Sequence, residues 1–223
     1  GQPLQPTMLR FLRDQFVFLR EFGSRFETTG SIVPSSRFLA RAITRYLAQR
    51  GEEPIRVLEC GPGTGAFTDQ IVRHLRAGDR LDLVELNEAF VEVLRKRLAT
   101  EPHWQAVAEQ VAIHQLPLQK FADVEPYDFI ISGLPHVNFP PELVQTIFES
   151  YFRLLKPGGT LSYFEYMYIR PLRRTLTVGQ ARRKIVAVNR VVETYLKPHR
   201  LRRDNTFINF PPAWVQHLRR AAE

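Results

Sequence analysis

The sequence predicts an α/β domain built on a mostly parallel, doubly wound sheet. From Pro54 onward, short apolar runs with the length of strands alternate with longer helical patterns, an order that favours parallel strands with helical crossovers. A glycine-rich turn, Gly61–Gly65, stands directly between the first strand and its helix, where glycine allows sharp turns and close ligand approach. An acid, Glu85, follows at the end of the second strand, as in folds that bind a ribose there.

The first fifty residues predict two helices. Met8–Phe26 places Phe and Leu on one face and arginines on the other at 100° per residue. A break follows, and Ser36 is expected to cap a second helix over residues 37–50. Residues 1–50 are therefore expected to be a helical extension of a domain that spans residues 51–223.

The rest of the chain continues the alternation without an internal repeat or linker. The expected strands are residues 55–60, 80–86, 110–116, 127–134 and 159–167, and the expected helices are residues 66–77, 88–100, 141–155 and 179–196. Residues 199–210 are expected to supply a closing hairpin.

Composition excludes several classes of protein and limits the choice of partner. No run of 18 apolar residues exists and no signal peptide is visible, so neither a membrane span nor secretion is expected. A single cysteine, Cys60, excludes an internal disulfide framework and fits a reducing compartment. No Cys/His cluster with metal-ligand spacing is present, and no metal is expected. The net charge of +8 favours a polyanionic partner, either nucleic acid or an anionic membrane.

The glycine turn and the acids beside it resemble motifs I and II of class I S-adenosylmethionine-dependent methyltransferases. The turn reads G-P-G-T-G, one residue shorter than the dinucleotide pattern, and Glu59 precedes its first glycine by two positions. The resemblance implies a Rossmann-like, mostly parallel seven-stranded sheet with helices on both faces, and S-adenosylmethionine as cofactor, converted to S-adenosylhomocysteine. It implies cofactor-binding roles for Ser35, Ser36, Glu59, Gly61, Gly63, Thr64, Glu85, Leu86, Leu116, Pro117 and Ser132.

The loop after the fourth strand is the expected substrate loop. It reads Ser132-Gly133-Leu134-Pro135-His136 and lacks the Asn or Asp, Pro and aromatic series typical of adenine amine methylation. Together with "GSIVPSSRFLARAI", "LECGPGTGAFT" and "FINFPPAWV", the stretch "ISGLPHVNFP" resembles the bacterial phospholipid N-methyltransferases. That resemblance implies successive methylation of phosphatidylethanolamine toward phosphatidylcholine. The alternatives are another amino-lipid such as an ornithine lipid, an rRNA adenine N6-dimethyltransferase-like enzyme, and a non-catalytic lipid-surface module.

The residues expected to carry the chemistry lie in this loop and on the last parallel strand. They are Ser132, Gly133, Leu134, Pro135, His136 and Tyr166. Alternation along the strand puts Tyr166 on one face and Tyr163 on the other. A tyrosine face suits methylated ammonium groups through cation–π attraction, but it equally suits a buried core. His136 is a candidate proton acceptor or an incidental loop residue, and Ser35 and Ser36 are either helix caps or pocket residues.

If the substrate is a lipid, the predicted first helix is expected to contact the membrane. An amphipathic helix flanked by arginines can lie in the membrane interface, and a lid over the cofactor is the alternative. The residues expected at the membrane are Arg10, Phe11, Arg13, Phe18, Arg20 and Phe22. The protein is therefore expected in the cytoplasm, peripherally bound to the inner face of the membrane, with phospholipid rather than nucleic acid as partner.

Overall fold

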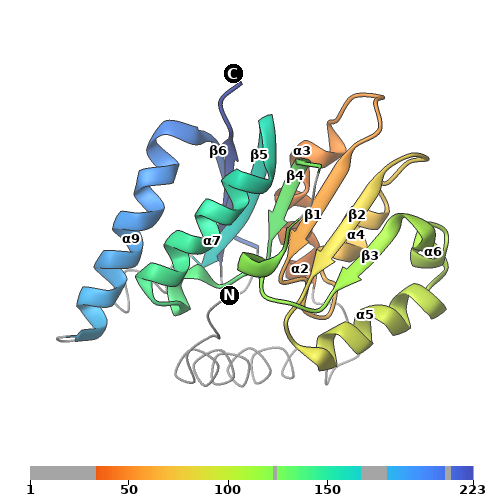
Figure 1. The fold of residues 1–223 in the computed structure, drawn as a ribbon, viewed down its shortest axis with the longest axis horizontal. Coiled ribbons are helices and arrows are strands. Elements are labelled where there is room, and N and C mark those ends of the chain that lie inside the picture. Colours follow the sequence, from red (N-terminus) through yellow and green to blue (C-terminus); the bar gives the residue numbers. More distant parts are fainter. Residues whose placement is uncertain (1–33, 123–124, 167–179, 209–211, 223) are drawn as a thin grey trace.

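The protein contains a seven-stranded sheet with helices on both faces (Figure 1). The computed structural model describes residues 34–122, 125–166, 180–208 and 212–222. Strand order is β3-β2-β1-β4-β5-β7-β6. The strands are β1 (Arg56–Cys60), β2 (Arg80–Val84), β3 (Val111–His114), β4 (Tyr127–Ser132), β5 (Leu155–Tyr166), β6 (Arg200–Thr206) and β7 (Ala213–Arg219).

The sheet is mostly parallel, as the sequence predicted. Strands β1 to β5 pair in parallel, whereas β7 pairs antiparallel with both β5 and β6. The chain moves outward from β1 through β2 to β3, then returns to the other side of β1 with β4. This reversal of strand order creates a switch point at the carboxyl ends of β1 and β4, which is where open α/β sheets bind ligands.

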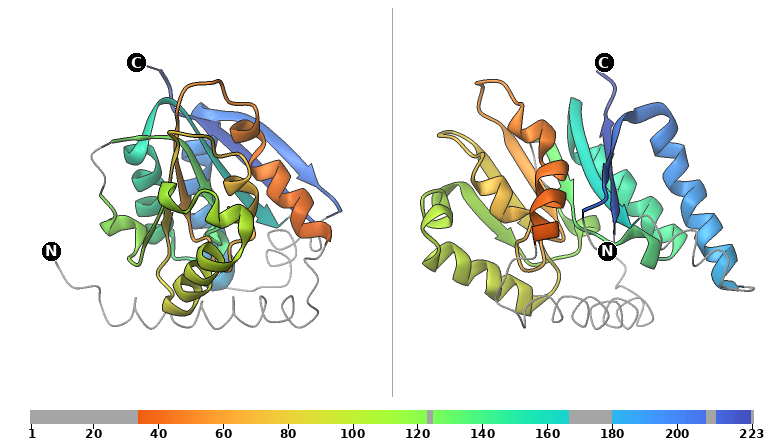
Figure 2. Two further views of the ribbon diagram at one scale, coloured as in Figure 1. Left: turned by 90° about the vertical axis from the view of Figure 1, so that its right-hand side faces the viewer. Right: turned by 180° about the vertical axis from the view of Figure 1, so that it is seen from behind.

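Two groups of helices cover the two faces of the sheet (Figures 1 and 2). Apolar residues of α7 and α9 share one core cluster with β4, β5 and β7, and residues of α2 to α6 share the other. The helices are α2 (Pro34–Ile43), α3 (Arg45–Ala48), α4 (Thr68–Val72), α5 (Glu88–Thr100), α6 (Pro102–Gln105), α7 (Pro141–Leu154) and α9 (Gln180–His199), with 3-10 turns η1 (Ala108–Gln110), η2 (Leu118–Lys120) and η3 (His136–Asn138).

Burial on both faces explains why the central strands read as continuous apolar runs. In β1, Val57 packs with the cluster beneath α2 to α6, and Leu58 packs with the cluster beneath α7. A parallel strand covered on both faces has no solvent side and needs no polar alternation. On α2 and α3, Leu39, Ile43 and Leu47 belong to the same core as Val57, so these helices pack directly on the sheet.

Several predicted elements differ from the structure at their ends, and two helices show why. Helix α2 begins at Pro34, so Ser36 lies inside its first turn and is not the expected N-cap; proline suits a first helical position. Helix α4 ends at Val72, short of the predicted residue 77, because the Asp79 carboxylate accepts the Arg76 N–H at 2.6 Å. That N–H would otherwise continue the helix.

The expected hairpin within residues 199–210 is also wrong in its second strand. Residues 200–206 form β6, but its partner β7 begins only at Ala213. Proline cannot donate a ladder hydrogen bond, and Pro211 and Pro212 precede β7, which delays the return strand.

The amphipathic helix predicted for Met8–Phe26, with its expected membrane residues, lies outside the described residues. Among the helices that the structure does describe, none combines the length and the apolar character required to cross a bilayer.

A buried polar cluster joins α3 to the final hairpin. Asp204 on β6 accepts Arg45 Nε at 2.7 Å, and lies 3.2 Å from His217 Nε2 on β7. The other ring nitrogen, His217 Nδ1, lies 2.8 Å from Ser162 Oγ on β5. Burial lowers the pKa of His217 to about 4, although the Asp204 carboxylate opposes this. The folded protein therefore holds His217 neutral.

We expect His217 to make folding stability depend on pH. An unfolded histidine titrates near 6.5, so the unfolded chain takes up this proton first and stability falls as the pH drops from about 6.5 to 4, by up to about 3 kcal/mol. Urea unfolding between pH 7 and pH 4.5 should show a shallower fall for His217→Gln than for the wild type. His199→Gln leaves His217 in place and should keep the wild-type slope; equal slopes for all three proteins would contradict the assignment.

Candidate functional site

The glycine turn after β1 forms the centre of the candidate site. Gly61, Gly63 and Gly65 have φ of 68°, 57° and 89°, values in the left-handed region that favours glycine. A Cβ added at Gly63 would meet nothing within 4 Å. The backbone at Gly63 is therefore open to a ligand, and its conformation makes any larger residue unfavourable there.

Glu85, after β2, is held against this turn. Its Oε2 accepts the Gly63 N–H at 3.0 Å and its Oε1 accepts the Asn87 N–H at 2.9 Å. Burial raises the pKa of Glu85, and the backbone hydrogen bonds from Asn87 and Gly63 oppose that rise. The side chain is thus a nearly buried acceptor whose position is fixed by the loop it faces. Leu86 follows it and is half-buried.

Glu59, the last but one residue of β1, is fully buried. Its Oε2 accepts a hydrogen bond from Thr68 Oγ1 at 2.6 Å, while Oε1 has no partner among the described residues. Burial raises the pKa of Glu59 to about 8; the Thr68 hydrogen bond opposes this, and the charge of Glu85 adds to it. An unsatisfied buried carboxylate oxygen is costly, so this atom is well placed to receive a donor or a cation from a ligand.

The loops after β1 and β4 cross in close contact. The Gly133 N–H donates to the Cys60 carbonyl at 2.9 Å. A Cβ at Gly133 would lie 2.5 Å from the Gly61 carbonyl oxygen, and one at Gly61 would lie 2.5 Å from Leu134 Cδ2. Packing against backbone therefore requires glycine at position 133, the φ of 68° favours glycine at position 61, and the predicted substrate loop lies directly beside the glycine turn.

The polar side chains of the substrate loop bond to the core below it. Ser132 Oγ lies 2.6 Å from the Tyr151 hydroxyl and accepts the Leu134 N–H at 3.2 Å. His136 Nε2 lies 3.0 Å from the same hydroxyl, and its ring packs against the rings of Phe148 and Tyr163. With 2% of its surface exposed, His136 is a supporting residue beneath the loop in this structure. Pro135 and Leu134 are half-buried in the loop itself.

Aromatic side chains line the neighbouring end of β5. Tyr166 contacts Phe164, with ring centroids 5.3 Å apart, and Phe164 contacts Phe67 at 5.6 Å. Phe67 directly precedes α4, so this aromatic group joins β5 to the segment after the glycine turn. The Tyr166 side chain lies on the face opposite Tyr163, as strand alternation predicted.

Of the remaining predicted residues, some lie in the glycine turn and others on neighbouring segments. Thr64 belongs to the glycine turn, and Leu116 and Pro117 follow β3 and are half-buried. Ser35 and Ser36 lie in the first turn of α2, and their side chains are outside the described atoms.

An arginine holds the glycine turn from outside. Arg97 on α5 donates from Nη1 to the carbonyls of Thr64 and Gly65, each at 3.0 Å. Its other nitrogens bind Asp69 at 3.1 Å and Glu101 at 2.7 and 3.0 Å, and its guanidinium lies over the Trp104 ring. The turn is therefore fixed from two sides, by Glu85 and by Arg97.

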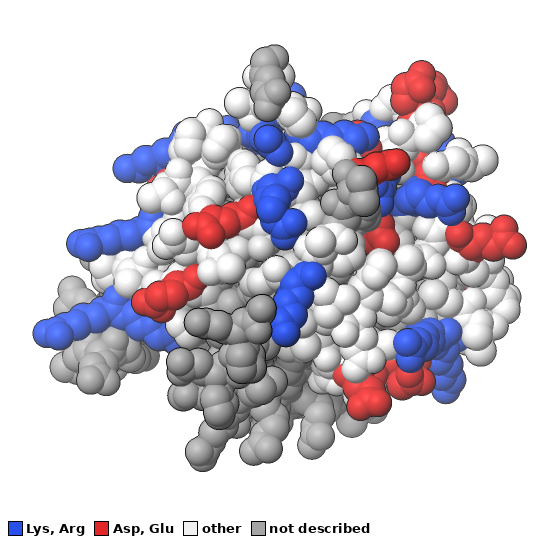
Figure 3. Space-filling view, viewed as in Figure 1, with Lys and Arg blue, Asp and Glu red and all other residues white. Residues whose placement is uncertain are grey.

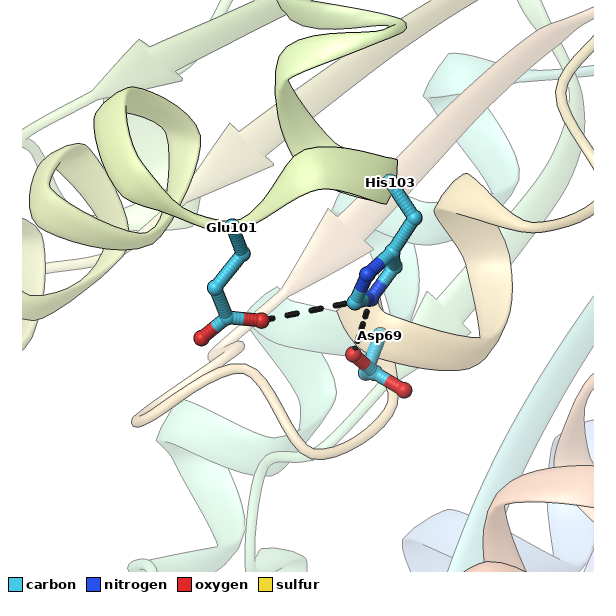
Figure 4. Close-up of side chains that lie close together, drawn as sticks. All are labelled: Asp69, Glu101 and His103. Carbon is cyan, nitrogen blue, oxygen red and sulfur yellow. Dashed lines mark hydrogen bonds and ion pairs between the residues drawn. The ribbon is translucent and has the colours of Figure 1, made fainter.

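Asp69, Glu101 and His103 lie close enough together to suggest a metal site (Figure 4). His103 Nε2 is 2.6 Å from Asp69 Oδ1. Trp104 Nε1 and Arg97 Nη2 also donate to that oxygen, each at 3.1 Å. Because Arg97 pairs with both carboxylates and Arg73 also pairs with Asp69, we interpret the cluster as the support of the glycine turn.

A cleft of about 390 Å³ lies away from these residues, where β1 and β2 begin. It is lined by charged residues that pair with one another, such as Arg56 with Asp82 at 3.5 Å and with Glu125 at 3.3 Å. None of the predicted site residues lines it, so it is not our candidate site.

Sequence reasoning missed three supporting side chains. Thr68 bonds to Glu59, Arg97 holds the glycine turn, and Tyr151 bonds to Ser132 of the substrate loop. Each is 9 to 33 residues from its partner, and no motif of fixed spacing marks such a contact. Among the residues around Arg97, the sequence gives a signal only for Trp104, because a large aromatic side chain is expected to be buried.

Comparison with known proteins agrees with this geometry. The model of a methyltransferase domain matches residues 57–159. An ornithine lipid N-methyltransferase of Singulisphaera acidiphila is 31% identical over 156 residues, which cover 70% of this chain and 80% of that protein. The ribosomal RNA small subunit methyltransferase A of Pseudomonas syringae pv. tomato is 25% identical over 72% of this chain and 52% of its own length.

A solved structure shares the fold along nearly the whole chain. The O-methyltransferase from Bacillus cereus in complex with S-adenosylhomocysteine superimposes with a TM-score of 0.63 at 16% identity, over 98% of this chain and 92% of that one. Matching family, matching fold and an acid-flanked glycine turn agree: the chain belongs to the class I S-adenosylmethionine-dependent methyltransferases and uses S-adenosylmethionine as its cofactor.

Proposed function

We propose that the enzyme methylates the primary amine in the headgroup of a membrane amino-lipid. The observation that carries the proposal is the similarity to an ornithine lipid N-methyltransferase along 80% of that protein's length. The resemblance to phospholipid N-methyltransferases supports phosphatidylethanolamine, methylated stepwise toward phosphatidylcholine, as a second candidate of the same class. Both headgroups present a primary amine at a membrane surface, so we assign the enzyme to the cytoplasmic face of the membrane.

The residues of the glycine turn fit the cofactor. Bound there, S-adenosylmethionine supplies an electrophilic methyl group on a sulfonium. We assign Glu85 to the ribose hydroxyls, because it is a fixed acceptor at the end of β2. We assign Glu59 to the amino group, because its Oε1 lacks a partner in the described part of the chain. Gly61 and Gly63 leave the backbone accessible, and Leu86, Leu116 and Pro117 offer apolar contact to the adenine.

The substrate loop favours a flexible amine over a planar base. Ser132 Oγ is engaged with Tyr151 and the Leu134 N–H, and residues 132–136 include no carboxylate or amide side chain to hold an exocyclic amine in the plane of a base. Tyr166, with Phe164 and Phe67, supplies aromatic faces at the end of β5. Such faces attract a methylated ammonium by cation–π interaction, by about 0.5–2 kcal/mol each.

The lipid ammonium must lose a proton before it attacks. Its pKa in water is about 10.4, by analogy with lysine. Burial and the nearby sulfonium charge both disfavour the cation and lower that pKa. The chain then contributes chiefly by alignment, since holding two reactants in line lowers a barrier by as much as about 7–11 kcal/mol. Burial raises the pKa of the Tyr166 hydroxyl, so this group stays protonated near neutral pH.

An rRNA adenine methyltransferase is the candidate from another class of substrate, favoured by the net charge of +8 and by the similarity to the Pseudomonas enzyme. The substrate loop opposes it. On the face shown in Figure 3, Lys and Arg side chains are interspersed with Asp and Glu and do not form one continuous basic patch of the kind that nucleic acid would require.

The function is tested by offering labelled S-adenosylmethionine with three substrates side by side: phosphatidylethanolamine vesicles, ornithine lipid vesicles and unmodified ribosomal RNA. We expect label in a lipid phase, and chromatography of the products will identify the lipid and the number of methyl groups. Glu85→Ala serves as the negative control. Label in the RNA alone would contradict the proposal and establish the rRNA methyltransferase.

Removing the Glu85 carboxylate should weaken cofactor binding. We expect Glu85→Ala to lower the affinity for S-adenosylmethionine more than tenfold, which corresponds to about 1.4 kcal/mol or more, because the ribose acceptor and the anchor of Gly63 are both lost. Titration calorimetry measures this. Glu88→Ala, an exposed acid in the first turn of α5, is the matched control and should bind like the wild type, as Glu85→Ala itself would if the ribose assignment were wrong.

Cofactor binding should also release a proton from Glu59. With a pKa of about 8 in the free protein, this carboxyl is largely protonated at pH 7, and a bound ammonium favours its charged form. Affinity should therefore rise with pH and level off above about 8. Calorimetry in two buffers of different ionisation enthalpy should detect fewer protons released by Glu59→Gln than by the wild type. Equal release from the two proteins would rule out this role.

A further inference from the structure

Large apolar side chains are exposed at the end of the last hairpin. Phe207 and Ile208 follow β6 and are 66% and 67% exposed, and Phe38 on α2 is 42% exposed. Val186 and Leu201 are the other exposed large apolar side chains among the described residues. Two adjacent side chains this exposed at the tip of a turn contribute nothing to the core, and exposed apolar groups that gather together mark an interaction site.

This tip lies on the same side of the sheet as the candidate active site, the side formed by the carboxyl ends of the parallel strands. Strand β6 is antiparallel to β7, and β7 is antiparallel to β5, so β6 runs parallel to β5. The carboxyl end of β6, which leads into Phe207 and Ile208, therefore lies at the edge where the glycine turn and Tyr166 are found. Leu201, near the start of β6, lies six residues away from Phe207, about 20 Å along the strand.

Helix α2, which carries Phe38, lies beside β6. The hydrogen bond from Arg45 to Asp204 fixes α3 beside β6, and helical hydrogen bonds continue through Thr44 into α2. Phe38 is seven residues before Arg45, about 10 Å along a helix, and Ile208 lies four residues beyond Asp204, in the turn just past the end of β6. Figure 2 shows the first turn of α2 beside the end of β6, so the helix that carries Phe38 lies near the tip.

Exposed arginines border the apolar tip. Arg37 and Arg41 are exposed on α2, on either side of Phe38 in the sequence. We call Arg37, Phe38, Arg41, Phe207 and Ile208 the hairpin rim. Apolar side chains that enter the acyl region, flanked by cations at the level of the lipid phosphates, are the composition of surfaces that bind anionic bilayers.

We propose that the hairpin rim inserts into an anionic lipid bilayer and presents the active-site edge of the sheet to it. The inference rests on the proposed function, because a bilayer is where an amino-lipid headgroup is offered. It involves residues distinct from the predicted helix Met8–Phe26. A protein partner would be the other occupant of such a rim, but the positive charge around its apolar tip favours a negatively charged surface.

Vesicle binding without any amino-lipid tests the rim separately from the reaction. Phosphatidylcholine vesicles containing phosphatidylglycerol should co-sediment with the wild type, and the double variant Phe207→Asp with Ile208→Asp should bind at least tenfold more weakly. Leu201→Asp, near the other end of the same strand, should bind like the wild type. Wild-type binding by the double variant, or an equal loss in Leu201→Asp, would overturn the proposal, as would a wild type that does not bind.

A second measurement reports insertion directly and retains the apolar surface. Tryptophan fluorescence of Phe207→Trp should be quenched by brominated lipid, above the background of the wild type, whereas Leu201→Trp should show no added quenching. Equal quenching of the two variants would contradict the insertion of the hairpin rim into the bilayer. If the wild type binds vesicles yet methylates no amino-lipid, the proposed function fails while the rim stands, so the two failures are distinguishable.

Discussion

The crossing of two backbone loops is the constraint on which the candidate site depends. Gly133 lies so close to the Gly61 carbonyl that no side chain fits between them, and its N–H bonds to the Cys60 carbonyl at 2.9 Å. The cofactor loop and the substrate loop are thereby held in one fixed relation at the point where strand order reverses. Methyl transfer requires that the methyl donor and the acceptor amine lie in line. The contact between the two loops fixes the position of one loop relative to the other.

The acids around that crossing illustrate how a binding site differs from a core. Glu59 is buried with one oxygen unpaired, and Glu85 is buried with both oxygens bonded to backbone. Burial raises the pKa of both groups. The unpaired oxygen of Glu59 costs stability in the free protein, and a cationic ligand would offset that cost, whereas Asp69 and Glu101 are paired with Arg97 within the protein itself. The first pair is suited to a ligand and the second group to support.

Local patterns predicted much of this fold because the central strands and helices carry their own signals. Val57 and Leu58 read as a buried strand, and the helix expected at residues 88–100 is α5 with the same bounds. The glycine turn and Glu85 were predictable because their spacing is set by one strand–turn–helix unit. Asp79, which ends α4, and Arg97, which supports the turn, act through contacts distant in sequence, and periodicity cannot reveal these. Strand β7 was missed because Trp214, Gln216 and His217 interrupt the apolar alternation, although the sheet buries both Gln216 and His217.

The ion pair between Arg45 and Asp204 joins residues 159 positions apart. On a ribosome the first helices emerge long before β6 exists, so α2 and α3 lack their final neighbours until almost the entire chain has been made. Contacts of such long range slow folding, because a large loop must close before they form. Until then the apolar faces of α2 and α3 lack their contacts with the last strands, and partly exposed apolar surface makes a nascent chain prone to aggregation. The strands β6 and β7, which complete the sheet, thus also complete the docking of the helices made first.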